Sequence, residues 1–198
     1  MILADIGNTA TKVYESGQIQ TLSHQEAQKK YQKQTVYFIS VNQEFGLTHT
    51  NWVDISDKIT LDTAYRGMGI DRKALCMAVS DGVLVDAGSA ITVDVMQGGV
   101  HLGGYILPGL MAYQKCYAQI SDELDTTLNP NVSMQTLPQN TQDAISYGVI
   151  ASIRALLHDT IRDKVYFTGG DGKFLSKHFD YAMYDATLVF KGMMKGLQ

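Results

Sequence analysis

The chain has 198 residues, of which 45% are hydrophobic and 18% charged, and its formal net charge is -4 at pH 7. These values are typical of one or two compact globular domains. Lysine and arginine are scattered along a mildly acidic chain, which argues against nucleic acid as a partner. The two cysteines, Cys76 and Cys116, have neither paired nor metal-type spacing, and this favours a reducing compartment.

The chain shows no targeting signal. Met1 leads directly into an apolar run with no basic segment or cleavage site. No apolar stretch approaches the roughly twenty residues that cross a bilayer. We therefore expect a soluble cytoplasmic protein without a membrane partner.

The first part of the chain predicts short strands around helices. Apolar and β-branched runs separated by turn residues indicate strands, and three-and-four spacing of apolar residues indicates helices. We expect strands at 2–6, 11–14, 19–22, 36–41 and 52–55, and helices at 25–32 and 71–80.

The same order restarts near residue 83. We expect strands at 83–85, 90–96, 100–106 and 165–167, and helices at 110–124, 142–162, 173–178 and 186–194. Asn140 or Thr141 can cap the helix that begins at 142. Each half reads strand, hairpin, helix and strand, so the sequence predicts a duplicated α/β fold with halves at 1–80 and 81–198 and a cleft between them. Ligands of such sheets lie at the carboxyl ends of strands.

The stretch DIGNT (residues 5–9) ends the first strand. A carboxylate beside the backbone amides of a glycine turn suits a phosphate with its magnesium, and Asp5 can hold that ion through water. The alternative is an ordinary hairpin turn with a local hydrogen bond from the aspartate. A second copy of this pattern, DAGSA (residues 86–90), favours a clamp on a polyphosphate. In it Asp86 can bind a cation and Ser89 a phosphoryl oxygen.

Between the two copies, GIDR (residues 69–72) begins a helix. Asp71 can simply cap that helix. Alternatively, Asp71 accepts a hydroxyl proton from a substrate while Arg72 holds a carboxylate.

Two glycine-rich stretches follow strands in the second half. HLGGYILPGL (residues 101–110) permits close backbone approach and offers the free amides of a new helix to an anion, although tight packing explains it nearly as well. FTGGDG (residues 167–172) is a turn where an adenosine can lie flat against the backbone. The histidines share no metal-ligand spacing, so we expect them to be surface or core residues.

Taken together and in this order, DIGNT, GIDR, DAGSAITVD, GGYILPGL, NTQDAISYG and FTGGDG resemble the type III pantothenate kinases from Met1 to about Gly170. That family belongs to the superfamily of sugar kinases, acetate kinase, actin and heat-shock ATPases. The resemblance implies a duplicated ribonuclease H-like fold with an interdomain cleft. It also implies transfer of the γ-phosphoryl group of ATP to pantothenate, the first step of coenzyme A biosynthesis, by a homodimer with active sites near its interface.

The resemblance also implies roles for individual residues. Asp71 is the expected proton acceptor, Asp5 organises magnesium, and Asp86 holds a monovalent cation, potassium or ammonium. The residues expected to bind ATP are Asp5, Ile6, Gly7, Asn8, Thr9, Ala10, Thr11, Lys12 and Ser89. Those expected to bind pantothenate are Tyr65, Gly69, Ile70, Asp71, Arg72 and Thr141.

The chain departs from the family pattern at three places. Ser89 replaces a threonine and keeps the hydroxyl. Ala10-Thr11 stands where another asparagine is common, which affects the phosphate contacts. The first half is short, so Tyr65 is only the nearest candidate for an aromatic residue that lies further upstream in the family.

Three other functions remain open on sequence grounds. The chain can be another small-molecule kinase of the same superfamily, or a non-catalytic nucleotide-binding regulator. The intact acidic residues argue against the regulator. An actin-like filament protein is disfavoured, because the chain is too short for the added subdomains.

Overall fold

The computed structural model describes residues 1–42, 45–47, 49–161, 164–180 and 182–198, which form two compact units. The first unit contains 1–81, 96–103 and 186–198, and the second contains 82–95 and 104–185. The halves expected from the sequence, 1–80 and 81–198, differ from these units in two segments. The tip of one hairpin and the C-terminal helix belong with the first unit, because their contacts are made there.

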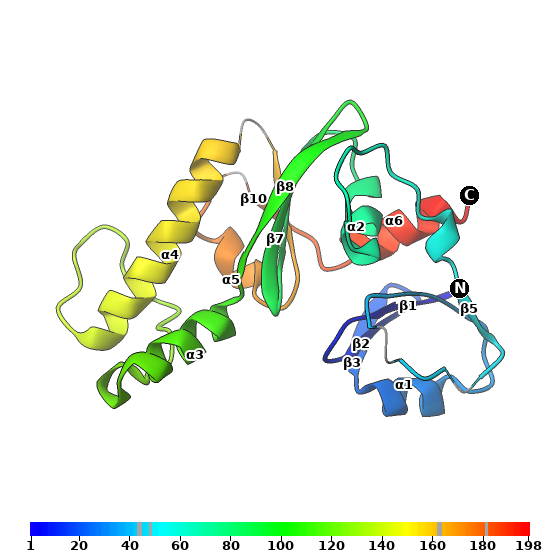
Figure 1. The fold of residues 1–198 in the computed structure, drawn as a ribbon, viewed down its shortest axis with the longest axis horizontal. Coiled ribbons are helices and arrows are strands. Elements are labelled where there is room, and N and C mark those ends of the chain that lie inside the picture. Colours follow the sequence, from blue (N-terminus) through cyan, green and yellow to red (C-terminus); the bar gives the residue numbers. More distant parts are fainter. Residues whose placement is uncertain (43–44, 48, 162–163, 181) are drawn as a thin grey trace. The chain divides into compact units, whose positions relative to one another are not determined.

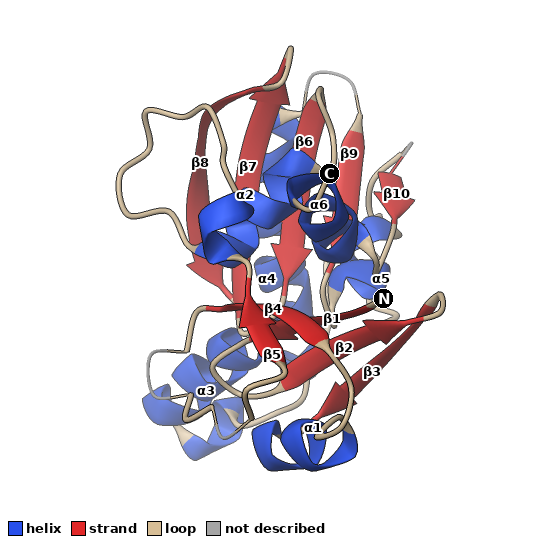
Figure 2. Ribbon diagram, turned by 90° about the vertical axis from the view of Figure 1, so that its right-hand side faces the viewer, coloured by secondary structure: helices blue, strands red, loops and turns tan. Residues whose placement is uncertain are grey.

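The first unit contains a five-stranded sheet with the order β3-β2-β1-β4-β5 (Figure 2). β1 pairs antiparallel with β2 and parallel with β4, while β2 with β3 form a hairpin and β4 with β5 are parallel. The strands are β1 (Ile2–Ile6), β2 (Thr11–Glu15), β3 (Gln18–Leu22), β4 (Val36–Ser40) and β5 (Trp52–Asp54).

Helices cover both faces of this sheet. They are α1 (His24–Lys30), α2 (Ile70–Met77) and α6 (Leu188–Gly196), with the short 3-10 turn η1 (Ser56–Lys58). Because side chains alternate along a strand, Ile2 and Ala4 of β1 pack in the core that contains Ala27 of α1. Leu3 packs in the core formed with α2 and α6.

The second unit repeats this topology. Its sheet has the order β10-β9-β6-β7-β8, which reads from the other end as hairpin, central strand and two further strands, as in the first unit. Its elements are β6 (Gly82–Ala87), β7 (Ala90–Gln97), β8 (Val100–Pro108), α3 (Leu110–Ile120), η2 (Asp122–Leu124), α4 (Thr141–Thr160), β9 (Val165–Thr168), α5 (Gly172–Ser176) and β10 (Ala182–Tyr184). The equal strand orders confirm the predicted duplicated α/β fold.

The predicted elements agree with the structure to within a few residues at most ends. β10 was not predicted from the sequence. The helix expected at 110–124 ends at Ile120 and is followed by η2. The expected end of the long helix at Arg162 lies outside the described residues. Among those that are described, no helix combines the length and apolar character needed to cross a membrane.

The C-terminal helix packs on α2 at very short range. Figure 1 shows α2 and α6 side by side, and both belong to the first unit. A methyl group added at Gly192 of α6 would lie 1.6 Å from the carbonyl oxygen of Ala74 in α2. Lys195 Nζ donates a hydrogen bond to the carbonyl of Ala78, which follows α2, at 3.1 Å. Only glycine at position 192 therefore permits this helix contact.

We predict that Gly192→Ala lowers the free energy of unfolding by roughly 2–3 kcal/mol, because the two helices must separate to admit the methyl group. Gly148→Ala in α4 is the matched control, since a methyl group there meets nothing within 4 Å. Because alanine favours helix over glycine, this control should be neutral or gain up to about 1 kcal/mol. Urea unfolding followed by circular dichroism measures both. Equal stability of the two variants would refute the tight contact.

Candidate functional site

The first acidic turn lies where β1 ends. Asp5 is the penultimate residue of β1, is half-buried, and stands opposite Lys12 of β2 in the ladder. The amide of Gly7 donates to the carbonyl of Ala10 at 3.0 Å and closes the turn. Opposed residues of an antiparallel pair share a face of the sheet, so Asp5 and Lys12 point to the same side. The remaining residues of the predicted phosphate stretch are Ile6, Asn8, Thr9 and Thr11, of which Asn8 and Thr9 are exposed.

The GIDR stretch lies at the same edge of the first sheet as this turn. Val41 follows β4 and donates its amide to the carbonyl of Ile6 at 3.1 Å. Gly69 lies beside Val41, since a methyl group there would be 3.8 Å from Val41 Cγ1. Asp5 also shares the face of Leu3, on which α2 packs. The structure thus brings the two predicted motifs of the first unit to one edge and one face.

Asp71 does not cap its helix. Gly69 is the N-cap of α2, with Ile70 as its first residue and Asp71 as its second. The amide of Arg72 donates to Asp71 Oδ1 at 2.7 Å, so the carboxylate is held among the first amides of the helix. The simple capping interpretation is therefore wrong. A negative charge in this turn is stabilised by the helix dipole.

Arg72 and Tyr65 are in contact. The guanidinium carbon of Arg72 lies over the Tyr65 ring, 4.8 Å from its centroid, and Arg72 is only 6% exposed. Tyr65 also faces the ring of His101 at 6.0 Å. Sequence reasoning assigned no role to His101 or to its partner Thr63. Thr63 and His101 are 38 positions apart in the sequence, so no local sequence pattern indicates their contact.

Three glycine-containing motifs meet in the second unit. Asp86 is the penultimate residue of β6, as Asp5 is of β1. Gly109 precedes α3 and lies against the hairpin turn, because a methyl group there would be 2.5 Å from the carbonyl oxygen of Ser89. At Gly169 such a group would be 2.4 Å from Asp86 Oδ1, and its φ of 86° further restricts the position to glycine. The structure thus brings DAGSA, PG and TGG together.

The oxygen atoms around Asp86 are suited to a hard cation. Asp86 Oδ1 is buried, and the added methyl group at Gly169 would also lie 2.3 Å from the carbonyl oxygen of Ala87. The backbone of Gly169 therefore packs directly against both oxygens. Alkali and alkaline-earth ions prefer oxygen ligands of this kind. The amide of Asp171 donates to the same carbonyl at 2.9 Å and fixes its direction.

A hollow of about 270 Å³ adjoins the TGGDG turn in the second unit. Asp171 lines it, and burial raises the pKa of this carboxyl above its usual range. The other lining residues are Leu110, Met111, Gln114, Leu128, Pro130 and Phe174. The hollow combines apolar side chains with the polar side chains of Gln114 and Asp171, a mixture that small-ligand sites often have.

Thr141 is positioned by a different element. It is exposed and is the first residue of α4, whose N-cap Asn140 accepts a hydrogen bond from the amide of Asp143 at 2.9 Å. Of the two predicted caps, Asn140 is therefore the one used. Hydrogen bonds from Asn129 and then Asn140 hold the pKa of Asp143 below its ordinary value. The helix start is thus well fixed.

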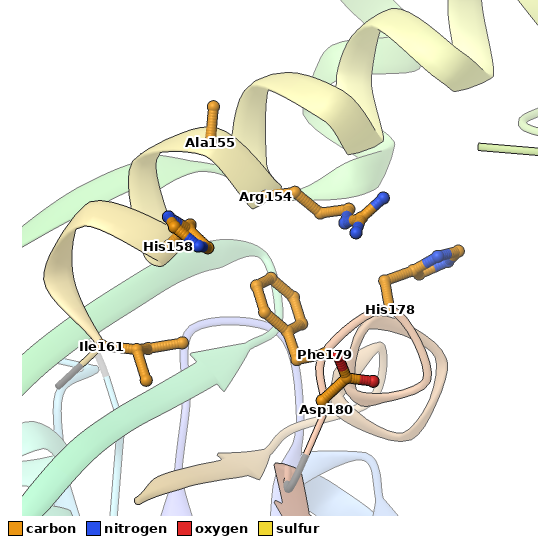
Figure 3. A pocket seen from close by; sticks show the side chains of 7 residues that line it. All are labelled: Arg154, Ala155, His158, Ile161, His178, Phe179 and Asp180. Atoms are coloured by element: carbon orange, nitrogen blue, oxygen red, sulfur yellow. The ribbon is translucent and has the colours of Figure 1, made fainter. Parts of the chain in front are cut away.

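A larger hollow of about 560 Å³ lies near the end of α4. Figure 3 shows the ring of Phe179 among side chains from α4 and from the segment after α5. Its lining residues are Arg154, Ala155, His158, Ile161, His178, Phe179 and Asp180. None of the predicted site residues is among them.

Comparison with known proteins gives one consistent family. Residues 40–163 match the family model described as type III pantothenate kinase. A protein of that name from Helicobacter hepaticus is 49% identical, over 100% of this chain and 98% of its own length. Another from Campylobacter jejuni is 43% identical, over 98% of this chain and 95% of its own length.

Solved structures agree in fold. A Campylobacter jejuni protein with the provisional name of a Baf family transcriptional activator has a TM-score of 0.90 and 41% identity, covering 100% of this chain and 97% of its own. The activator of 2-hydroxyisocaproyl-CoA dehydratase from Clostridium difficile, with bound ADPNP, has a TM-score of 0.57 at 12% identity, covering 97% and 91%. At that identity the likeness concerns the fold alone.

Proposed function

The chain belongs to the type III pantothenate kinase family, and from this premise we propose which of its residues carry the reaction. The protein is a phosphotransferase that uses ATP to phosphorylate pantothenate in coenzyme A biosynthesis. The observation that carries the proposal is the arrangement of acidic residues at one edge of the first unit's sheet. There Asp5, at the end of β1, lies on the same side as the helix start that holds Asp71 and Arg72.

In our proposal the phosphates of ATP contact the first hairpin, from Asp5 to Lys12. Phosphoryl transfer depends mainly on positioning and on stabilising charge. The backbone amides of a tight turn and the ammonium group of Lys12 can donate hydrogen bonds to phosphate oxygens. Lys12 is suited to this role because it stands opposite Asp5 on the same face.

We assign magnesium to Asp5. Magnesium keeps several waters and takes one or two carboxylates together with phosphate oxygens, and a single half-buried carboxylate beside a glycine turn fits that preference. When bound, the ion neutralises charge on the phosphates. The contribution of Asp5 is to hold a fixed negative charge at the end of a paired strand.

We assign the acceptor alcohol to α2. Asp71 is the proposed proton acceptor, and its carboxylate is kept in place by the amide of Arg72. Arg72 is the proposed partner of the pantothenate carboxylate, for which a planar guanidinium gives two parallel hydrogen bonds. Gly69 and Ile70 bring the backbone close to the substrate, and Tyr65 and Thr141 complete the proposed contacts.

Adenosine is proposed to lie at the hollow next to Asp171. Its size, its apolar side chains and the neighbouring glycine turn support this placement. A flat base fits against backbone that carries no side chain. The cytoplasmic location expected from the sequence stays part of this proposal.

We predict that Asp71→Asn keeps the binding of ATP and pantothenate but lowers turnover by roughly 10²–10⁴-fold, because general base catalysis is lost. The measurement is phosphopantothenate formation by mass spectrometry, with ATP, magnesium, potassium and pantothenate supplied. Asp57→Asn, at an exposed position in η1, is the matched control and should be unaffected. Unchanged turnover of Asp71→Asn would remove the assigned role, whereas no product from the unaltered protein would overturn the function itself.

We also propose a monovalent cation, potassium or ammonium, at Asp86, supported by the buried carboxylate oxygen of Asp86 and the adjacent carbonyl of Ala87. The protein should then react faster in potassium than in sodium buffer at equal ionic strength. Asp86→Asn should abolish the difference, while Asp122→Asn, exposed in η2, should keep it. Equal rates in both buffers would exclude the assignment.

Finally, we propose a homodimer. Edge strand β8 and helix α3 of the second unit expose Ile106, Met111 and Ile120, each by more than half. Exposed apolar side chains on an edge strand and on the helix that follows it support an interface on these elements. Sedimentation should give twice 21.8 kDa for the protein. Met111→Glu should give the monomer. Leu137→Glu, at another exposed position, is the control and should stay dimeric. A monomeric unaltered protein would contradict the proposal.

A further inference from the structure

A short segment before α2 is held against the start of β8. The amide of His101 donates to the carbonyl of Asp62 at 3.0 Å, and Thr63 forms an isolated parallel bridge with His101. Residues 62–65 and 96–103 all belong to the first unit. This backbone contact fixes a loop that would otherwise connect η1 with α2 without regular structure.

Side chains extend this attachment to Tyr65. His101 is 3% exposed, and its Nδ1 shares a hydrogen bond of 2.7 Å with Thr63 Oγ1. The same hydroxyl oxygen accepts the amide of Tyr65 at 3.0 Å. The Tyr65 ring then lies 6.0 Å from the imidazole, tilted by 53°. Thr63 thus links a buried histidine to the backbone of the tyrosine.

Tyr65 in turn covers Arg72. The guanidinium carbon is 4.8 Å from the ring centroid, within the range of a cation–π contact. A guanidinium placed over a ring is restricted in position by that ring, and its N–H groups lie in the guanidinium plane. The orientation of the N–H groups therefore depends on where Tyr65 is held.

We propose that His101 and Thr63 are positioning residues, which hold Tyr65 over Arg72 and so set the direction in which the guanidinium meets the substrate carboxylate. The inference rests on the role proposed above for Arg72. It also extends the role of Tyr65. Its ring would hold the arginine in place in addition to contacting pantothenate. The pair acts on carboxylate recognition and leaves ATP binding untouched.

The first test observes Arg72 directly. The Nε–Hε signal of Arg72 in an ¹⁵N–¹H spectrum of the full chain, assigned by its absence in Arg72→Lys, carries a ring-current shift from Tyr65. We expect Tyr65→Leu to remove this shift and Tyr65→Phe to keep it. Thr63→Val should reduce it, because valine keeps the shape of threonine but lacks the hydroxyl, whereas Thr63→Ser should retain it. An unchanged signal in Tyr65→Leu or Thr63→Val would overturn the positioning role.

The second test separates the two substrates. In Thr63→Val the KM for pantothenate should rise roughly tenfold, while the KM for ATP stays within about twofold, and Thr63→Ser should restore the original value. Equal losses in the valine and serine variants, or equal rises in both KM values, would indicate a merely structural role and reject the proposal. If the unaltered protein does not phosphorylate pantothenate, the proposed roles in the reaction fail, but the spectrum still decides whether Thr63 positions Tyr65 on Arg72.

Discussion

The contact between α6 and α2 is the constraint on which the position of the start of α2 depends, where we propose that the acceptor alcohol binds. Gly192 lets the backbone of the last helix touch Ala74, in the same helix that begins at Gly69. Since packed helices transmit displacement with little compliance, the position of this contact sets where the start of α2 stands relative to β1. A helix from the end of the chain thus fixes a carboxylate encoded near its middle.

The acidic hairpin turn follows the central strand in both units, but the groups around its aspartate differ. In both units the central strand ends with an aspartate as its penultimate residue and continues into a hairpin. In the first unit the aspartate faces Lys12 across the ladder. In the second, Gly169 packs against Asp86 and Ala87, and Gly109 packs against the hairpin turn. We therefore propose different ligands for the two turns, a phosphate in one unit and a cation in the other.

Most strands and the duplicated order could be predicted because they depend on local periodicity, which β1 and α4 show clearly. The capping interpretation of Asp71 failed for a local reason. Glycine already occupies the N-cap, so the carboxylate falls two positions further along and accepts a hydrogen bond from the amide of Arg72. β10 was missed, although β5, which is equally short, was predicted.

The sequence by itself determined the two acidic turns, the GIDR helix start and the family, since each depends on residues adjacent in the chain. Only the tertiary structure decided which unit the C-terminal helix joins, that Gly109 and Gly169 meet the second hairpin, and that Thr63 and His101 hold Tyr65. The physical reason is that packing and hydrogen bonds between distant segments depend on how the backbone folds, and no local spacing encodes such contacts.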